Sequence, residues 1–243
     1  MFQPQGNAPH LHWLCQRLQA RGLLRATADA LPAWLPAEWQ GFAGEHCWLD
    51  LASDDSDGLM QRSQLCRQHQ TDCIEICGQW LPQGAQFGFM LLCGGERTAL
   101  QRAAPWLDCN APLDGGWLHC GPLGSARYTW HVLNAIQHGW QLLLQQIPVD
   151  GQPVAINWEW LLQQQNQLCD MLYQLSSHYL QRQGIDPKLI SPDAARSNFA
   201  LPCGEQAHFA ANLAILIVLA LQQQETLHTL LQQLSATLPT PNP

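Results

Sequence analysis

Few residues of this chain have the types and spacing that chemistry requires. His131 and His138 are seven positions apart, so on a helix they would project to roughly the same side and, with a nearby Asp or Cys, could ligate a metal ion. Asp54, Asp55 and Asp57 could bind a cation in the same way. We interpret the histidines as a surface pair and the aspartates as a helix cap. We therefore predict no metal site.

Nucleophilic catalysis is the other chemistry that these residue types allow. Cys120 and Ser125 stand near His119, but nothing beyond adjacency links them. The chain has ten cysteines, and its closest pair, Cys73 and Cys77, has CxxxC spacing rather than the CxxC of zinc sites. The first ten residues lack a basic and then apolar secretory signal. We expect reduced cysteines that act as small core residues.

Composition excludes some classes of partner. The formal net charge is −8, charged residues make up 12% of the chain, and Lys188 is the only lysine. Binding to nucleic acid or to an anionic membrane surface requires clustered Lys and Arg, so neither is expected. The longest apolar run, residues 213–221, is shorter than the roughly 20 residues of a membrane span. We expect a soluble, cytoplasmic protein.

Hydrophobic periodicity indicates the elements that would position these residues. Strands are predicted at residues 47–51, 73–77, 87–93 and 117–120, with helices at 56–70 and 96–106. Before them we expect frayed residues 1–10, a helix from residue 11 to about Gly22 and a short helix over 26–34. After Gly121 only helices are expected, at about 124–146, 158–183, 191–197 and 204–234. The fold class is therefore α/β followed by all-α.

Three stretches resemble the 6-phosphogluconate dehydrogenase family, within the hydroxyacid dehydrogenase superfamily. Residues 116–124 read GWLHCGPLG and lead into Tyr128, Val132, Asn134, Ile136 and Gly139, which is similar to the family's GPxG turn and its K-M-V-H-N-G-I-E-Y-G helix. Residues 84–95 resemble G-A-R-Y-G…L-M-P-G-G, and Leu49-Asp50 resembles the start of I-D-G-G-N-S. The resemblance covers about residues 49–146. Together with the predicted elements, it implies a truncated Rossmann-like domain at 1–120 and a helical domain at 121–238. We expect a disordered tail at 239–243.

The resemblance also shows what is missing. The family binds its nicotinamide cofactor with G-x-G-x-x-G, and no such run occurs here, so we predict that NADP binding is lost and no cofactor is held. The family's general-base Lys falls at Trp130, its His at Leu133 and its general-acid Glu at Gln137. Its Asn is kept as Asn134, and its phosphate-contacting Tyr falls at His138. Since Trp and Gln cannot shuttle protons, the catalytic positions are degenerate. Asn134 and His138 remain as vestigial ligand-binding candidates.

Three hypotheses about function follow. The first is a non-catalytic pseudoenzyme that binds or assembles with another protein, as a homodimer or hetero-complex. The eleven tryptophans and the apolar residues 207–221 fit interface anchors or simply core. The second is a metabolite sensor that uses the old substrate cleft near Asn134 and His138. The third is a residual NADP-dependent phosphogluconate dehydrogenase completed by a partner chain.

Overall fold

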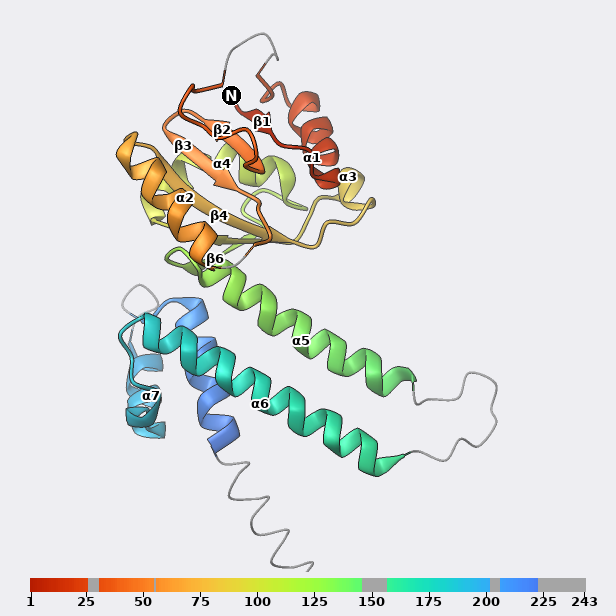
Figure 1. Cartoon of the computed structure of the whole chain (residues 1–243), viewed down its shortest axis with the longest axis vertical. Helices are drawn as coiled ribbons and strands as arrows, with labels where there is room; N and C mark the ends of the chain where they lie inside the picture. Colours follow the sequence, from red (N-terminus) through yellow and green to blue (C-terminus); the bar gives the residue numbers. More distant parts are fainter. Residues whose placement is uncertain (26–30, 55, 146–156, 202–205, 223–243) are drawn as a thin grey trace, which may run out of the picture. The chain divides into compact units, whose positions relative to one another are not determined.

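The computed structural model describes residues 1–25, 31–54, 56–145, 157–201 and 206–222 (Figure 1). The chain divides into two compact units, Met1–Trp130 and His131–Pro243. The first is an α/β unit and the second is all-helical, so the predicted fold class is confirmed. The predicted tail at residues 239–243 lies outside the described residues.

The α/β unit is built on a six-stranded sheet whose spatial order follows the chain. Its strands are β1 (Gln3–Gln5), β2 (Gly41–Gly44), β3 (Cys47–Asp50), β4 (Asp72–Gly78), β5 (Leu91–Gly94) and β6 (Trp117–Gly121). The β3–β4 and β5–β6 pairs are parallel, and the other three are antiparallel. Because β2 and β1 add antiparallel strands beside β3, the edge that a shortened parallel sheet would expose is paired.

Helices cover the two faces of this sheet. Helices α1 (Pro9–Ala20) and α4 (Arg97–Asn110) pack on one face, where Leu14, Leu18 and Trp106 are fully buried against strand residues such as Phe42. Helix α2 (Ser56–Gln68) packs on the other face, with Leu59 and Cys66 against Trp48 and Trp39. The short helix α3 (Gly84–Phe87) lies beside α1. Side chains of alternate strand residues thus enter two separate cores.

Most strands and helices predicted for the N-terminal half are confirmed, but the predictions for three segments are wrong. Residues 1–10 are not frayed, because Phe2 is 5% exposed in the core and Gln3–Gln5 pairs with β2. The strand expected at 87–93 begins only at Leu91, since α3 and the Gly88 turn occupy its first part. Residues 31–34, expected to end a helix, form no helix, and residues 26–30 lie outside the described part.

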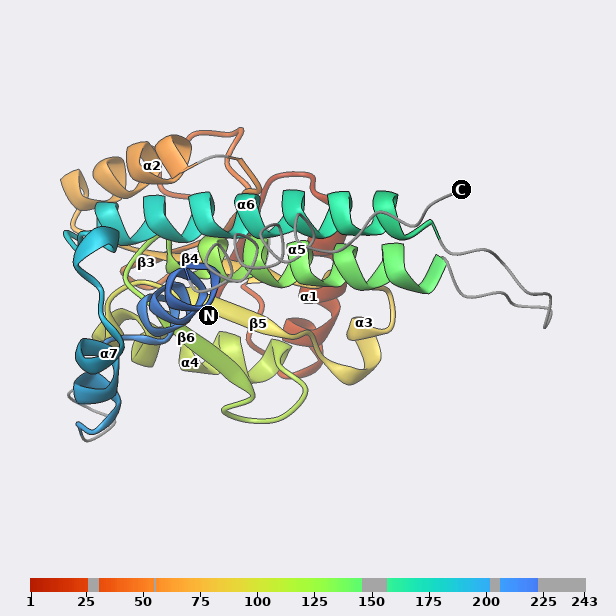
Figure 2. The ribbon, with the colours of Figure 1, turned by 90° about the horizontal axis from the view of Figure 1, so that it is seen from below.

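The helical unit is organised around two long helices. Helix α5 (Ser125–Gln145) begins in the α/β unit and continues into the helical one, and α6 (Trp158–Arg182) runs antiparallel beside it (Figures 1 and 2). They cross closely at Gly139, where an added methyl group would lie 2.7 Å from Cδ2 of Leu168. The 3-10 turn η1 (Pro187–Leu189), α7 (Pro192–Phe199) and the helical residues 209–222 follow. Asn198 of α7 donates a hydrogen bond to Asn212, which joins these last two helices.

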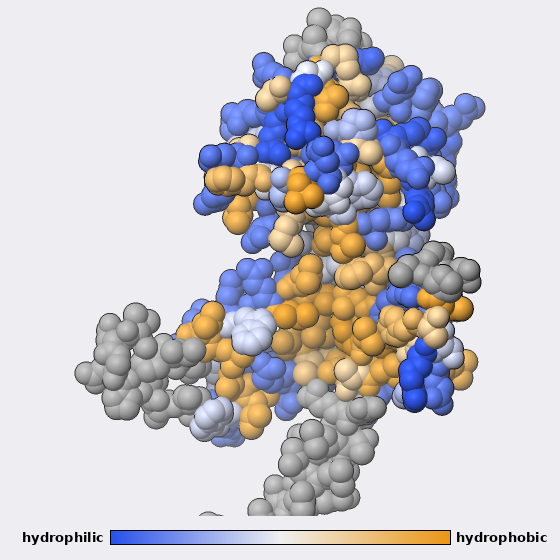
Figure 3. Space-filling view, turned by 180° about the vertical axis from the view of Figure 1, so that it is seen from behind, coloured by the Kyte–Doolittle hydropathy of each residue, from blue (hydrophilic) through white to orange (hydrophobic). Residues whose placement is uncertain are grey.

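Large hydrophobic side chains remain on the surface of the helical unit. Trp140, Leu144, Trp158 and Leu162 are each at least 60% exposed. Figure 3 shows that hydrophobic residues gather on one face of the helical unit. Among the described helices none combines the length and the apolar character that crossing a membrane requires.

Candidate functional site

One row of paired residues crosses the whole sheet and brings its buried carboxylates together. Gln5 pairs with Gly41, Gly41 with Asp50, Asp50 with Glu75, Glu75 with Gly94, and Gly94 with Gly121. Residues paired directly across strands project to the same face, so Asp50 and Glu75 both project toward α2. Both are completely buried. Because β1, β3, β5 and β6 all end at this row, helices α1, α2, α4 and α5 begin just beyond it.

Asp50 is held by two arginines from different helices. Its carboxylate accepts hydrogen bonds from Nε of Arg62 and from the backbone N–H of Ala52 at 3.0 Å, and it lies 3.5 Å from Nη2 of Arg127. Burial raises the pKa of the Asp50 carboxyl, while the two guanidinium groups oppose that shift. A buried carboxylate without a partner would strongly destabilise the fold, so the burial of Asp50 requires the two arginines.

Asp54 closes the cluster on the solvent side. It accepts hydrogen bonds from Nη1 and Nη2 of Arg62 at 2.6 and 2.7 Å, and from Nη1 of Arg127 at 3.0 Å. The hydrogen bonds from Arg62 hold the pKa of the Asp54 carboxyl below its ordinary value. Its side chain is 43% exposed, whereas those of Arg62 and Arg127 are 10% and 7% exposed. Asp54 is therefore the member of this cluster that solvent reaches.

Glu75 occupies the N-terminus of α5. Its carboxylate accepts backbone N–H groups of Gly124 at 2.9 Å, Ala126 at 3.2 Å and Arg127 at 3.1 Å, and it lies 3.2 Å from Nε of Arg127. Burial raises the pKa of Glu75 to about 7, against the lowering effect of these donors. The acid is fully buried and cannot touch a substrate, so its role is to bind the first turn of α5.

The start of α1 is occupied in a similar way. Oε1 of Gln40 accepts hydrogen bonds from the backbone N–H groups of Asn7 and Ala8, both at 2.9 Å. Gly6 has a φ of +100°, and a methyl group there would lie 2.2 Å from Oε1 of Gln40. A strand followed by a glycine turn and a helix start is where Rossmann-like folds hold phosphate groups. Here the chain's own side chains use these backbone donors.

The five positions singled out from the sequence lie on one side of α5. Trp130 and Asn134 are half-buried, whereas Leu133, Gln137 and His138 are exposed. Their spacing of three and four residues places them on one face of the helix. Trp80 stacks on His10 with ring centroids 4.8 Å apart.

Burial also disfavours chemistry at Cys120, the candidate nucleophile of the sequence. Cys120 is fully buried, and burial raises its thiol pKa to about 11, which disfavours the reactive thiolate. The nine cysteines of the described residues are free thiols, and Cys203 lies outside them. In the same described part, no three His, Cys, Asp or Glu side chains form a group suited to a metal ion.

Sequence reasoning missed the residues that form the cluster. Arg62, Glu75 and Arg127 were not singled out, and Asp50 was noticed only for its resemblance. A signal was present, because Glu75 lies between Ile74 and Ile76 in an apolar strand, where a charge requires a buried partner. The partner itself could not be identified, since Arg127 is 52 positions away.

Comparisons with known proteins support the resemblance. No family model matches the chain. It is 27% identical over 157 residues to the NAD(+)-dependent, decarboxylating 6-phosphogluconate dehydrogenase of Haloferax volcanii, covering 58% of this chain and 52% of that protein. The chain thus spans about half the length of this curated relative. The match confirms the resemblance to 6-phosphogluconate dehydrogenases.

A solved structure is also similar. It is the 3-hydroxyisobutyrate dehydrogenase of Mycobacterium tuberculosis with L-serine, at 15% identity and a TM-score of 0.34. The match covers 80% of this chain and 60% of that one.

Proposed function

We propose that this chain, a distant relative of the 6-phosphogluconate dehydrogenases over part of its length, is a non-catalytic protein that assembles with another protein chain. The first partner we propose is a second copy of itself. The observation that carries this proposal is the exposed face of α5. Where the resemblance expects a proton-transferring Lys and Glu, that face has Trp130 and Gln137.

The same helix has an exposed stripe of apolar side chains instead of catalytic ones. Leu133, Ile136, Trp140 and Leu144 follow one another at intervals of three and four residues and are 38–62% exposed. Because α5 and α6 are antiparallel, the start of α6 lies beside the end of α5 (Figure 2), and Trp158 and Leu162 in this part of α6 are also exposed. Exposed apolar patches of this kind are typical of protein interfaces, where aromatic side chains act as anchors.

The contacts at two helix starts of the α/β unit support the proposal that no dinucleotide binds there. Gln40 uses the backbone donors before α1, and Glu75 uses those of α5. A dinucleotide phosphate at α5 would have to displace the buried Glu75 side chain, which already accepts these backbone N–H groups. We therefore propose that neither NAD nor NADP binds in the manner usual for Rossmann-like domains.

Thermal melting tests this part of the proposal. A ligand that binds only the folded state stabilises it by about 2.7 kcal/mol at 100 times its dissociation constant. We expect no change in Tm with millimolar NAD or NADP, and no reduction of either cofactor in the presence of 6-phosphogluconate. A clear rise in Tm, or turnover, would overturn the non-catalytic function.

A further inference from the structure

An open cleft lies in the α/β unit, directly above the cluster of Asp50, Asp54 and the two arginines. Its volume is about 590 Å³, and it lies between residues 36–40, residues 52–54 and α2. This volume is within the range of roughly 300–1,000 Å³ that small-molecule sites occupy. The cleft also lies beyond the end of β3, and the crevice beyond strand ends is a common ligand position in α/β sheets.

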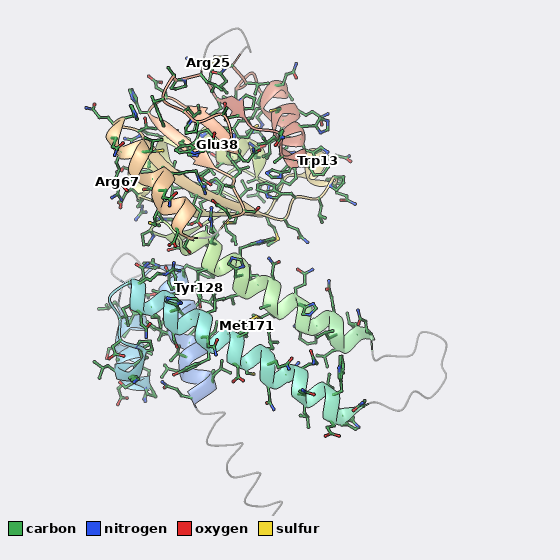
Figure 4. All side chains as sticks on the ribbon, viewed as in Figure 1. Trp13, Arg25, Glu38, Arg67, Tyr128 and Met171 are labelled. Carbon is green, nitrogen blue, oxygen red and sulfur yellow. The ribbon has the colours of Figure 1, made fainter. Side chains whose placement is uncertain are left out.

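The walls of the cleft differ in chemistry. Pro36, Trp39 and Leu65 supply apolar surface. Glu38 and Gln61 are exposed and supply polar groups at the opening. Figure 4 labels Glu38 in the α/β unit. A ligand with a short hydrocarbon part and a polar end could therefore place its hydrocarbon part against the apolar side chains and its polar end near Glu38 or Gln61.

The charge in and beneath the cleft is negative. Glu38 and Asp54 line it, and among the described residues that line it Arg62 is the one cation. That guanidinium is already bound to both Asp50 and Asp54. Beneath the lining, Arg127 is shared among Asp50, Asp54 and Glu75. Two carboxylates and one guanidinium group therefore line the cleft, and a lining with net negative charge attracts cations.

We propose that this cleft binds a small organic cation, an aliphatic amine. Its ammonium group would pair with Glu38 and the exposed side of Asp54, and its methylene groups would lie against Pro36, Trp39 and Leu65. Arg62 cannot recognise an anionic sugar acid without giving up its contacts to the buried Asp50. The proposal does not depend on self-assembly, because every residue named here belongs to the α/β unit.

Calorimetric titration of the full chain with putrescine as the probe tests this site. We expect saturable binding with one site per chain, and we expect Glu38→Gln to weaken it about tenfold, the effect of about 1.4 kcal/mol. Glu38 is exposed, so the variant should fold normally. Glu45→Gln is the matched control, because Glu45 is an exposed glutamate in the turn between β2 and β3, outside the lining of the cleft. It should leave the affinity within about twofold.

A second probe tests whether the charge or the shape of the ligand determines its affinity. Butane-1,4-diol has a similar length and no charge, and it should bind at least about tenfold more weakly than putrescine. Three results would overturn the proposal: no heat of binding from putrescine at millimolar concentration, equal weakening by the two glutamate variants, or equal affinity for the diol. The last would point to a site for uncharged polyols.

Discussion

Nε of Arg127 lies 3.2 Å from Oε1 of Glu75, and the backbone N–H of the same arginine donates to the same carboxylate at 3.1 Å. One residue of α5 is thus bound to one residue of β4 through both its side chain and its main chain. Because Glu75 is fully buried, these contacts replace the solvation that the acid loses on folding.

The ionisation of Glu75 should make stability depend on pH. Since its pKa is raised to about 7 from an ordinary 4.5, the folded protein holds the proton more tightly than the unfolded chain does. The contribution of Glu75 to the free energy of unfolding is therefore fully present below pH 4.5. It is lost as the pH rises to about 7, by an amount on the order of 3 kcal/mol. We expect the stability difference between the wild type and Glu75→Gln to shrink over this window in urea unfolding. A difference that grows with pH would mean that Arg127 and the helix start outweigh burial.

Arg62 should be essential to the fold. Arg62→Met removes the main partner of the buried Asp50, and we expect a loss on the order of 3–5 kcal/mol in urea unfolding. Arg102→Met is the control, because it removes an arginine that pairs with Asp72 where the side chains are 51% and 36% exposed. That variant should lose less than about 1 kcal/mol. Similar losses in both variants would contradict the importance of the cluster.

Gly94 should tolerate no side chain while Glu75 is present. An added methyl group would lie 2.5 Å from Oε2 of Glu75 and 3.1 Å from the carbonyl oxygen of Pro122. We expect Gly94→Ala to lose about 1–3 kcal/mol of stability. In the Glu75→Ala background most of that loss should disappear, which a double-mutant cycle measures. Strictly additive losses would show that the contact with Pro122 dominates.

The apolar stripe on α5 should determine the oligomeric state. If a second copy covers it, light scattering should give about twice the chain mass of 27.2 kDa. Trp140→Glu places a charge at a side chain that is 62% exposed, and it should shift the protein toward the monomer without lowering its stability. Leu189→Glu, at a side chain 79% exposed in η1, should leave the mass unchanged. A monomeric wild type would reject self-assembly and leave a different protein as the partner.

Local patterns in the sequence predicted most elements but not the cluster. Helices α2 and α5 and strand β4 follow from apolar periodicity and from the glycines that end neighbouring elements. Strands β1 and β2, with three and four residues, are too short for a periodic signal. They exist because Phe2 and Phe42 enter the core that α1 and α4 cover. The partner of Glu75 comes from a distant helix, and only the folded sheet brings the two residues together.

The position of Glu75 has a consequence for the concentration dependence of stability. A domain whose helix start is neutralised by a bound anion is stabilised by mass action, so its stability changes with the supply of that ligand. Here the carboxyl group that accepts these backbone hydrogen bonds is covalently part of the chain and is always present at the helix start. The contribution of this contact to stability is therefore independent of how much cofactor or phosphate the surroundings contain.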